Sequence, residues 1–169
     1  MIAVPSDLDL VDEEYKRDGG ETFRLISSVP STGSASNLAK VLVVDDNMFS
    51  GMALKTILKQ YDLESDVATD GKEAAAYVRE RYERHGDTYD LVFMDQAMPI
   101  CDGIKSTELI RAYLEGETGA SEQKPYICLM TTSYDKSLHT IDGINECFNK
   151  PIYKNGVEKI LAKANLLTQ

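Results

Sequence analysis

Hydrophobic residues in this 169-residue chain gather into short runs, and each run ends in polar residues. The clearest run is Leu91–Met94, which leads directly into Asp95 and a loop that closes at Pro99. An apolar run bounded by turn-forming residues predicts a strand that is buried on both faces of a sheet. Three further runs have the same form: Lys40–Val44 before Asp45 and Asp46, Tyr126–Met130 before Thr131, and the weaker Cys147–Asn149 before Lys150 and Pro151.

Residues with helical spacing separate these runs. Amphipathic helices are predicted from apolar positions at 54–61, 74–82, 110–114 and 157–164, and Asp66–Ala68 predicts a further short strand. Asp70 and Glu73 have the form of a capping box, and Asn155 can cap the last helix. Residues 134–145 have a poor helical pattern. The order strand then helix, repeated five times, predicts an α/β fold: a doubly wound, five-stranded parallel sheet with helices on both faces.

The first part of the chain differs in composition from the rest. Residues 1–38 are acidic, and they end in a stretch rich in Ser and Gly. Such a composition is typical of a disordered tail or linker. The sequence therefore predicts a tail over residues 1–38 and one folded domain over residues 39–169.

Charge and cysteine content exclude several classes of function. The formal net charge of -10 repels nucleic acid and anionic membrane surfaces, and we expect neither as a partner. The three cysteines are widely spaced and form no CxxC pair, which indicates a reducing compartment. No apolar stretch approaches the length of a membrane span, and the N-terminus lacks the features of a signal peptide. We therefore expect a cytoplasmic protein.

The residues that end the strands predict the chemistry. In an open parallel sheet, ligands bind at the carboxyl ends of the strands, so these residues share one edge. Asp45, Asp46 and Asp95 would repel one another there, and a divalent cation bound by oxygen ligands, such as Mg²⁺, removes the conflict. With the ammonium of Lys150 and the hydroxyl of Thr131, they could cradle a phosphoryl group.

These motifs together resemble one known family, the response-regulator receiver domains of two-component phosphorelays. The resemblance covers residues 39–167 and rests on four motifs in the same order: Val43–Asn47, Met94–Pro99 with Gly103, Met130–Thr131, and Lys150–Pro151. It implies a flavodoxin-like (CheY-like) sheet with strand order 2-1-3-4-5. The Lys150–Pro151 bond is similar to one that is usually cis in the family.

The resemblance also implies a role for each matched residue. Asp95 would accept a phosphoryl group from a histidine kinase or a histidine phosphotransfer protein. Asp45 and Asp46 would bind Mg²⁺ together with Asp95 and the backbone carbonyl of Ala97. Thr131 would be the switch hydroxyl, and Lys150 would contact the phosphoryl group. Phosphorylation would then remodel a protein-interaction face around the last strand and helix, for a downstream partner. Beyond self-dephosphorylation, no enzymatic turnover is expected.

The chain departs from the family pattern in three places. Cys147 stands where the family usually has an aromatic residue, and the aromatic Phe148 follows it. Thr132 stands where a small residue is usual, so either Thr131 or Thr132 could be the switch residue, and we favour Thr131. Little room remains for a helix between Thr131 and Lys150, and the output face is therefore expected to differ from the standard one.

Three alternatives remain at this point. A haloacid-dehalogenase-type phosphatase also uses an aspartate, a hydroxyl, a lysine and Mg²⁺, but it needs an Asp-x-Asp motif after its first strand. A degenerate receiver would bind a partner without phosphorylation. The chain could also be the terminal part of a hybrid histidine kinase, because residues 19–25 faintly resemble the last strand of a kinase ATP-binding domain.

Overall fold

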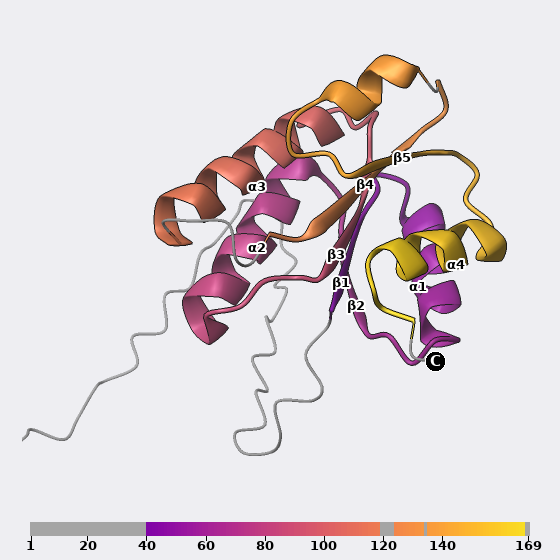
Figure 1. The fold of residues 1–169 in the computed structure, drawn as a ribbon, viewed down its shortest axis with the longest axis horizontal. Helices are drawn as coiled ribbons and strands as arrows, with labels where there is room; N and C mark the ends of the chain where they lie inside the picture. The colour runs from indigo at the N-terminus through magenta and orange to yellow at the C-terminus, as the bar shows by residue number, and fades with distance from the viewer. Residues whose placement is uncertain (1–39, 119–123, 134, 168–169) are drawn as a thin grey trace, which may run out of the picture. The chain divides into compact units, whose positions relative to one another are not determined.

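A computed structural model describes residues 40–118, 124–133 and 135–167 (Figure 1). The predicted tail, residues 1–38, lies outside this described part. The elements follow in chain order: β1 (Val41–Val44), α1 (Met48–Lys59), β2 (Ser65–Ala68), α2 (Gly71–His85), β3 (Leu91–Asp95), α3 (Gly103–Thr118), β4 (Tyr126–Thr131), the 3₁₀ helix η1 (Lys136–Thr140), β5 (Glu146–Asn149) and α4 (Lys154–Lys163).

The five strands form one parallel sheet in the order β2-β1-β3-β4-β5, which confirms the expected topology. β1 and β3 are buried along their whole length, as their unbroken apolar runs predict. Parallel register places Val44 beside Met94 and Asp95 beside Met130, so the carboxyl ends of the central strands lie at one edge. That edge holds the residues on which the predicted chemistry depends.

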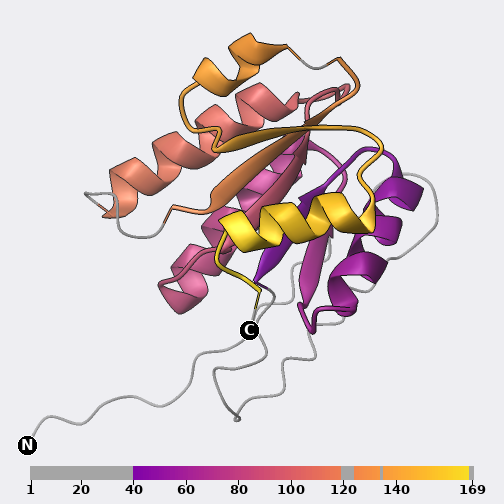
Figure 2. The ribbon, with the colours of Figure 1, turned by 45° about the vertical axis from the view of Figure 1, so that its right-hand side comes forward.

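Helices cover both faces of the sheet, because successive side chains of a strand point to opposite faces. Figures 1 and 2 show α1 and α4 on one face and α2 and α3 on the other. Within β1, Val41 and Val43 pack into a core with α1 and α4, whereas Leu42 and Val44 pack into a core with α2 and α3. None of the helices in the described part is long and apolar enough to cross a membrane.

The helix ends test the predicted caps. Asp70 caps α2, because its side chain accepts hydrogen bonds from the N–H groups of Lys72 and Glu73. The prediction that Asn155 caps the last helix was wrong. α4 begins at Lys154, and the N–H groups of its first turn donate to the carbonyl oxygen of Tyr153. Asn155 therefore lies inside the helix and not before it.

The connection between β4 and β5 corrects the expectation of five strand–helix units. Its described residues hold the 3₁₀ helix η1 and no α-helix. The apolar residues of this connection, Leu138, Ile141 and Ile144, recur every three positions and pack against the core beside α2 and α3. Only Leu138 lies within η1, because Ile141 follows the helix with extended backbone and Ile144 lies further along the connection. The described part of the fold therefore has five strands but four α-helices.

Candidate functional site

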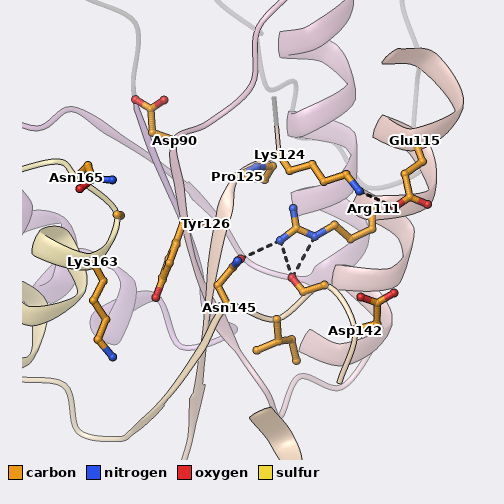
Figure 3. Close-up of a pocket in the computed structure, with 13 residues that line it drawn as sticks. Asp90, Arg111, Glu115, Lys124, Pro125, Tyr126, Asp142, Asn145, Lys163 and Asn165 are labelled. Carbon is orange, nitrogen blue, oxygen red and sulfur yellow. Dashed lines mark hydrogen bonds and ion pairs between the residues drawn. The ribbon is translucent and has the colours of Figure 1, made fainter. Parts of the chain in front are cut away.

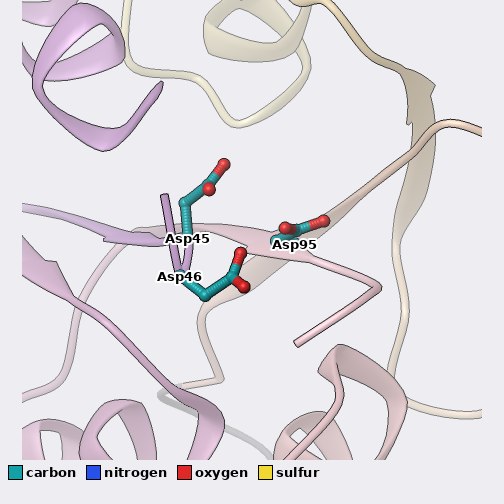
Figure 4. Close-up of side chains that lie close together, drawn as sticks. All are labelled: Asp45, Asp46 and Asp95. Carbon is teal, nitrogen blue, oxygen red and sulfur yellow. The ribbon is translucent and has the colours of Figure 1, made fainter. Parts of the chain in front are cut away.

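Three acidic side chains meet at the carboxyl edge of the sheet (Figure 4). Asp45 and Asp46 follow β1, and Asp95 is the last residue of β3. Each carboxylate places an oxygen within 4.8 Å of an oxygen from the others. Asp45 and Asp95 are only 2% and 6% exposed, whereas Asp46 faces solvent. Two of the three charges therefore need a partner inside the protein.

Lys150 provides that partner. Its Nζ lies 2.7 Å from Asp45 Oδ2 and 2.8 Å from Asp95 Oδ2. Burial opposes the charge on Lys150, but its contacts with the two carboxylates outweigh burial and raise the pKa of the lysine. Burial raises the pKa of Asp95, with a smaller contribution from Asp45, and Lys150 partly offsets that rise. The ammonium thus holds the two buried carboxylates together.

Backbone N–H groups fix the other oxygen of each buried carboxylate. The N–H of Asn47 donates to Asp45 Oδ1 at 2.9 Å, and the N–H of Ala97 donates to Asp95 Oδ1 at 3.3 Å. Asn47 also caps α1, because its side chain accepts from the N–H groups of Phe49 and Ser50. Sequence reasoning missed this role of Asn47. An Asn directly before an amphipathic helix was the signal that could have revealed it.

The end of β4 brings a hydroxyl to the same edge. Thr131 is the last residue of β4 and is 3% exposed, whereas Thr132 is exposed to solvent. Thr131 Oγ1 accepts a hydrogen bond from the N–H of Ser133, and the Thr131 carbonyl accepts one from the N–H of Lys150 at 2.7 Å. The Lys150–Pro151 bond is cis, as the resemblance implied. These contacts link the ends of β4 and β5 beside the acids.

Gly103 allows α3 to begin directly against Asp95. The N–H of Gly103 donates to the carbonyl of Gln96, and a methyl group at Gly103 would overlap the backbone oxygen of Asp95. Only a residue without Cβ allows this close approach. Gly103 therefore sets the position of the loop that follows β3.

The donor set fits a hard divalent cation. Three carboxylates with oxygens this close are ligands that Mg²⁺ prefers, and the exposed side of Asp46 leaves room for water ligands. Among the described residues this is the one group of three or more potential ligands of this kind. The predicted residues Asp45, Asp46 and Asp95 are thus brought together as expected. Lys150 lies beside them, and the N–H of Ala97 donates a hydrogen bond to Asp95.

A separate cavity of about 490 Å³ lies at the opposite, amino end of β4 (Figure 3). Arg111 on α3 donates to the carbonyl of Gly143 and to Asn145 Oδ1, and Asn145 Oδ1 also accepts from the N–H of Ile127. Lys124 pairs with Glu115 at 2.7 Å. These contacts brace the η1–β5 connection against α3 and β4, and the cavity shares no residue with the acidic cluster.

The sequence of residues 41–163 matches the family described as the response regulator receiver domain. The chain belongs to this family. Two-component response regulator 24 of Arabidopsis thaliana is 29% identical over 135 residues, which cover 80% of this chain and 90% of that protein. The osmosensing histidine protein kinase SLN1 of Saccharomyces cerevisiae is 32% identical over 143 residues, or 83% of this chain and 11% of the kinase.

The receiver spans a small part of its kinase relatives: 14% of histidine kinase 5 of Arabidopsis thaliana, 11% of SLN1 and 13% of probable histidine kinase 1 of Oryza sativa subsp. indica. It also resembles solved structures. The co-crystal structure of the Saccharomyces cerevisiae phosphotransfer protein Ypd1 with the receiver domain of Ssk1 gives a TM-score of 0.63 at 26% identity, over 73% of this chain and 86% of that one.

The fold is shared more widely than the sequence. A chain of the CheX–CheY–BeF3–Mg complex from Borrelia burgdorferi gives a TM-score of 0.61 at 24% identity. The alignment covers 75% of the present chain and 89% of that chain. Because residues 41–163 match the receiver family, the alternative of a haloacid-dehalogenase-type phosphatase is not retained for this domain. The protein carries a receiver domain of two-component phosphorelay signal transduction.

Proposed function

We propose that Asp95 accepts a phosphoryl group from the phosphohistidine of a histidine kinase or a histidine phosphotransfer protein. The observation that carries this proposal is the position of Lys150 Nζ, which lies within 2.8 Å of both Asp45 and Asp95. A fixed cation beside the acceptor carboxylate stabilises the negative charge that phosphoryl transfer brings to the site. A degenerate receiver would not need to keep this set of residues together.

The transfer forms one bond and breaks one. An oxygen of the Asp95 carboxylate bonds to phosphorus, the P–N bond of the donor breaks, and the imidazole nitrogen retains the electron pair. A Mg²⁺ ion held by Asp45, Asp46, Asp95 and the Ala97 carbonyl would neutralise charge on the transferring phosphoryl oxygens. Thr131 Oγ1, buried at the end of β4, accepts from the N–H of Ser133, and its own O–H would donate to the phosphoryl group.

The test uses a small phosphodonor. Full-length protein incubated with acetyl phosphate and MgCl₂ is expected to gain the mass of a single phosphoryl group, which peptide mapping after borohydride reduction should assign to Asp95. A protein that gains none, or that releases inorganic phosphate from a chromogenic ester over many turnovers, would contradict the proposal. The expectation of one phosphoryl group per chain distinguishes a receiver from a phosphatase.

We also propose that residues 39–169 are the receiver domain and that residues 1–38 are a tail or a linker, which would join the receiver to a further domain in a hybrid histidine kinase. The three free cysteines, Cys101, Cys128 and Cys147, are all buried, which fits the reducing environment of the cytoplasm.

We infer that the phosphodonor docks over the loops that follow β1, β3 and β5. Large apolar side chains are exposed just beyond the site residues: Met48, Phe49 and Met52 on α1, Ile100 after β3, and Tyr153 before α4. Exposed apolar residues gathered around a polar site are typical of a protein-interaction surface. α1 carries no acidic residue and α4 carries one, Glu158, so the two helices add little negative charge to that of Asp45, Asp46 and Asp95.

Phe49 is the most exposed of these side chains, at 87%, so it is expected to be an anchor of docking. Phe49→Ala should slow phosphoryl transfer from limiting phosphorylated Ypd1 by about tenfold, because aromatic anchors contribute most of the affinity at such interfaces. Phosphorylation by acetyl phosphate should not change, because the variant retains the backbone N–H that Asn47 binds.

The matched control is Leu109→Ala, which removes an exposed apolar side chain from α3 on the other face of the sheet. Leu109→Ala should transfer at the wild-type rate. Equal rates for Phe49→Ala and Leu109→Ala would show that the donor docks elsewhere. Stopped reactions followed by intact mass measure both rates.

A further inference from the structure

The strand β5 places its aromatic residue on an unusual side of the sheet. Because side chains alternate along a strand, Cys147 and Phe148 point to opposite faces. Cys147 is 5% exposed and packs in the core beside α2 and α3, together with Leu138 of η1. Phe148 packs against the core beneath α1 and α4. The small residue thus faces the shortened η1 connection, and the ring faces the last helix.

The ring of Phe148 lies directly against the backbone of α4. A Cβ at Gly156 would be 2.7 Å from Phe148 Cζ and 2.8 Å from Cε1, so no side chain separates the ring from the first turn of the helix. Interiors packed at this density do not absorb displacements by compression. A shift of Phe148 must therefore move the start of α4, where the exposed Tyr153 precedes the helix.

The same strand ends at the site. Phe148 pairs with Met130 and Asn149 with Thr131 in the parallel register of β4 and β5. The next residue, Lys150, donates its N–H to the Thr131 carbonyl and its Nζ to Asp95. A phosphoryl group on Asp95 changes the charge that Lys150 and Thr131 face, and both lie within two residues of Phe148 or its strand partner.

We propose that Phe148 transmits the phosphorylation state of Asp95 to α4, so that the docking face formed by α1 and the start of α4 changes on phosphorylation. The proposal rests on the function proposed above. It makes affinity for the donor depend on whether the phosphoryl group has been delivered, because one local charge biases two packings of α4. The β4–β5 connection packs on the side of Cys147 and not on that of Phe148, and it changes less.

Tryptophan reporters test this proposal, because the natural chain contains no Trp. Tyr153→Trp places a reporter at a site that is 67% exposed beside α4, and Lys136→Trp places one at an exposed position of η1. Each full-length variant is titrated with beryllofluoride and MgCl₂. The emission of Tyr153→Trp is expected to change with saturation. The emission change of Lys136→Trp is expected to be at most about one third as large.

Variants in β5 identify the transmitting residue. In the Tyr153→Trp background, Phe148→Leu and Phe148→Met, which replace the ring with two smaller side chains of similar volume, should each reduce the emission change about threefold or more, whereas Cys147→Ala should leave it intact. Bound beryllofluoride, seen by ¹⁹F NMR, shows that each variant is folded and loaded. Loaded Phe148→Leu and Phe148→Met with full responses, or a response confined to Lys136→Trp, would overturn the inference alone. Absence of bound beryllofluoride in the wild type would overturn the proposed function and this inference with it.

Discussion

Asp95→Asn is expected to abolish the uptake of a phosphoryl group from acetyl phosphate. The amide has nearly the shape of the carboxylate but lacks the charged oxygen that must bond to phosphorus. Removal of Mg²⁺ with EDTA is expected to have the same effect on the wild type, because the phosphoryl oxygens would then approach a cluster of acids without the divalent cation. Intact mass after incubation measures both losses.

The control for Asp95→Asn is Asp62→Asn, which makes the same chemical change at an exposed residue after α1. Asp62→Asn should be phosphorylated at the wild-type rate. Uptake of a phosphoryl group by Asp95→Asn would contradict the assignment, and peptide mapping would then show whether Asp46 or a hydroxyl group is the acceptor.

The acidic cluster could be predicted from the sequence because it depends on a rule of topology. Each buried run of apolar residues ends in the residue that carries the chemistry, and parallel strands bring those ends to one edge. The grouping of Asp45, Asp46 and Asp95 could therefore be predicted without knowledge of side-chain packing. The metal and acceptor roles given to them stay predictions until the experiments above are done.

Other features depend on packing that a linear pattern does not contain. The start of α4 was misplaced because Asn155 is a good cap by type, but the helix begins two residues earlier than that cap requires, with Tyr153 at the cap position. The 3₁₀ helix η1 was also missed, because Leu138 is the one apolar residue within it and a single residue makes no periodic pattern. The contact between Phe148 and Gly156 joins two elements and has no signature within either one.

The bridging position of Lys150 could not be predicted from the sequence either. The sequence predicted that the lysine lies beside the acids but not that it lies between two of them. That position has a consequence for stability. Because the pKa of Lys150 is raised above that of a free lysine, its contribution is fully present at neutral pH and is lost only as the pH rises above the ordinary lysine pKa through the raised one. At neutral pH the ammonium therefore stabilises the fold by attracting the carboxylates of both Asp45 and Asp95.

Lys150→Met is expected to lower the free energy of unfolding by about 2 kcal/mol in the absence of Mg²⁺. Removal of one partner from a buried ion pair costs about 3–5 kcal/mol, and the 20% exposure of the Lys150 side chain reduces that cost. A saturating divalent cation should restore most of the loss, because a ligand at about 100 times its Kd stabilises by about 2.7 kcal/mol. Urea denaturation with and without MgCl₂ measures the effect.

Two variants make the result for Lys150→Met specific. Lys105→Met removes a lysine that pairs with Glu108 at 3.0 Å on the exposed surface, and its loss should cost much less stability than that of Lys150. Adding Asp45→Asn to Lys150→Met should recover stability, since the coupling between two contacting charges is not additive. If Lys150→Met costs no more than Lys105→Met, or if Asp45→Asn makes it worse, the lysine does not hold the acids together. The electrostatic basis of the proposed site would then be wrong.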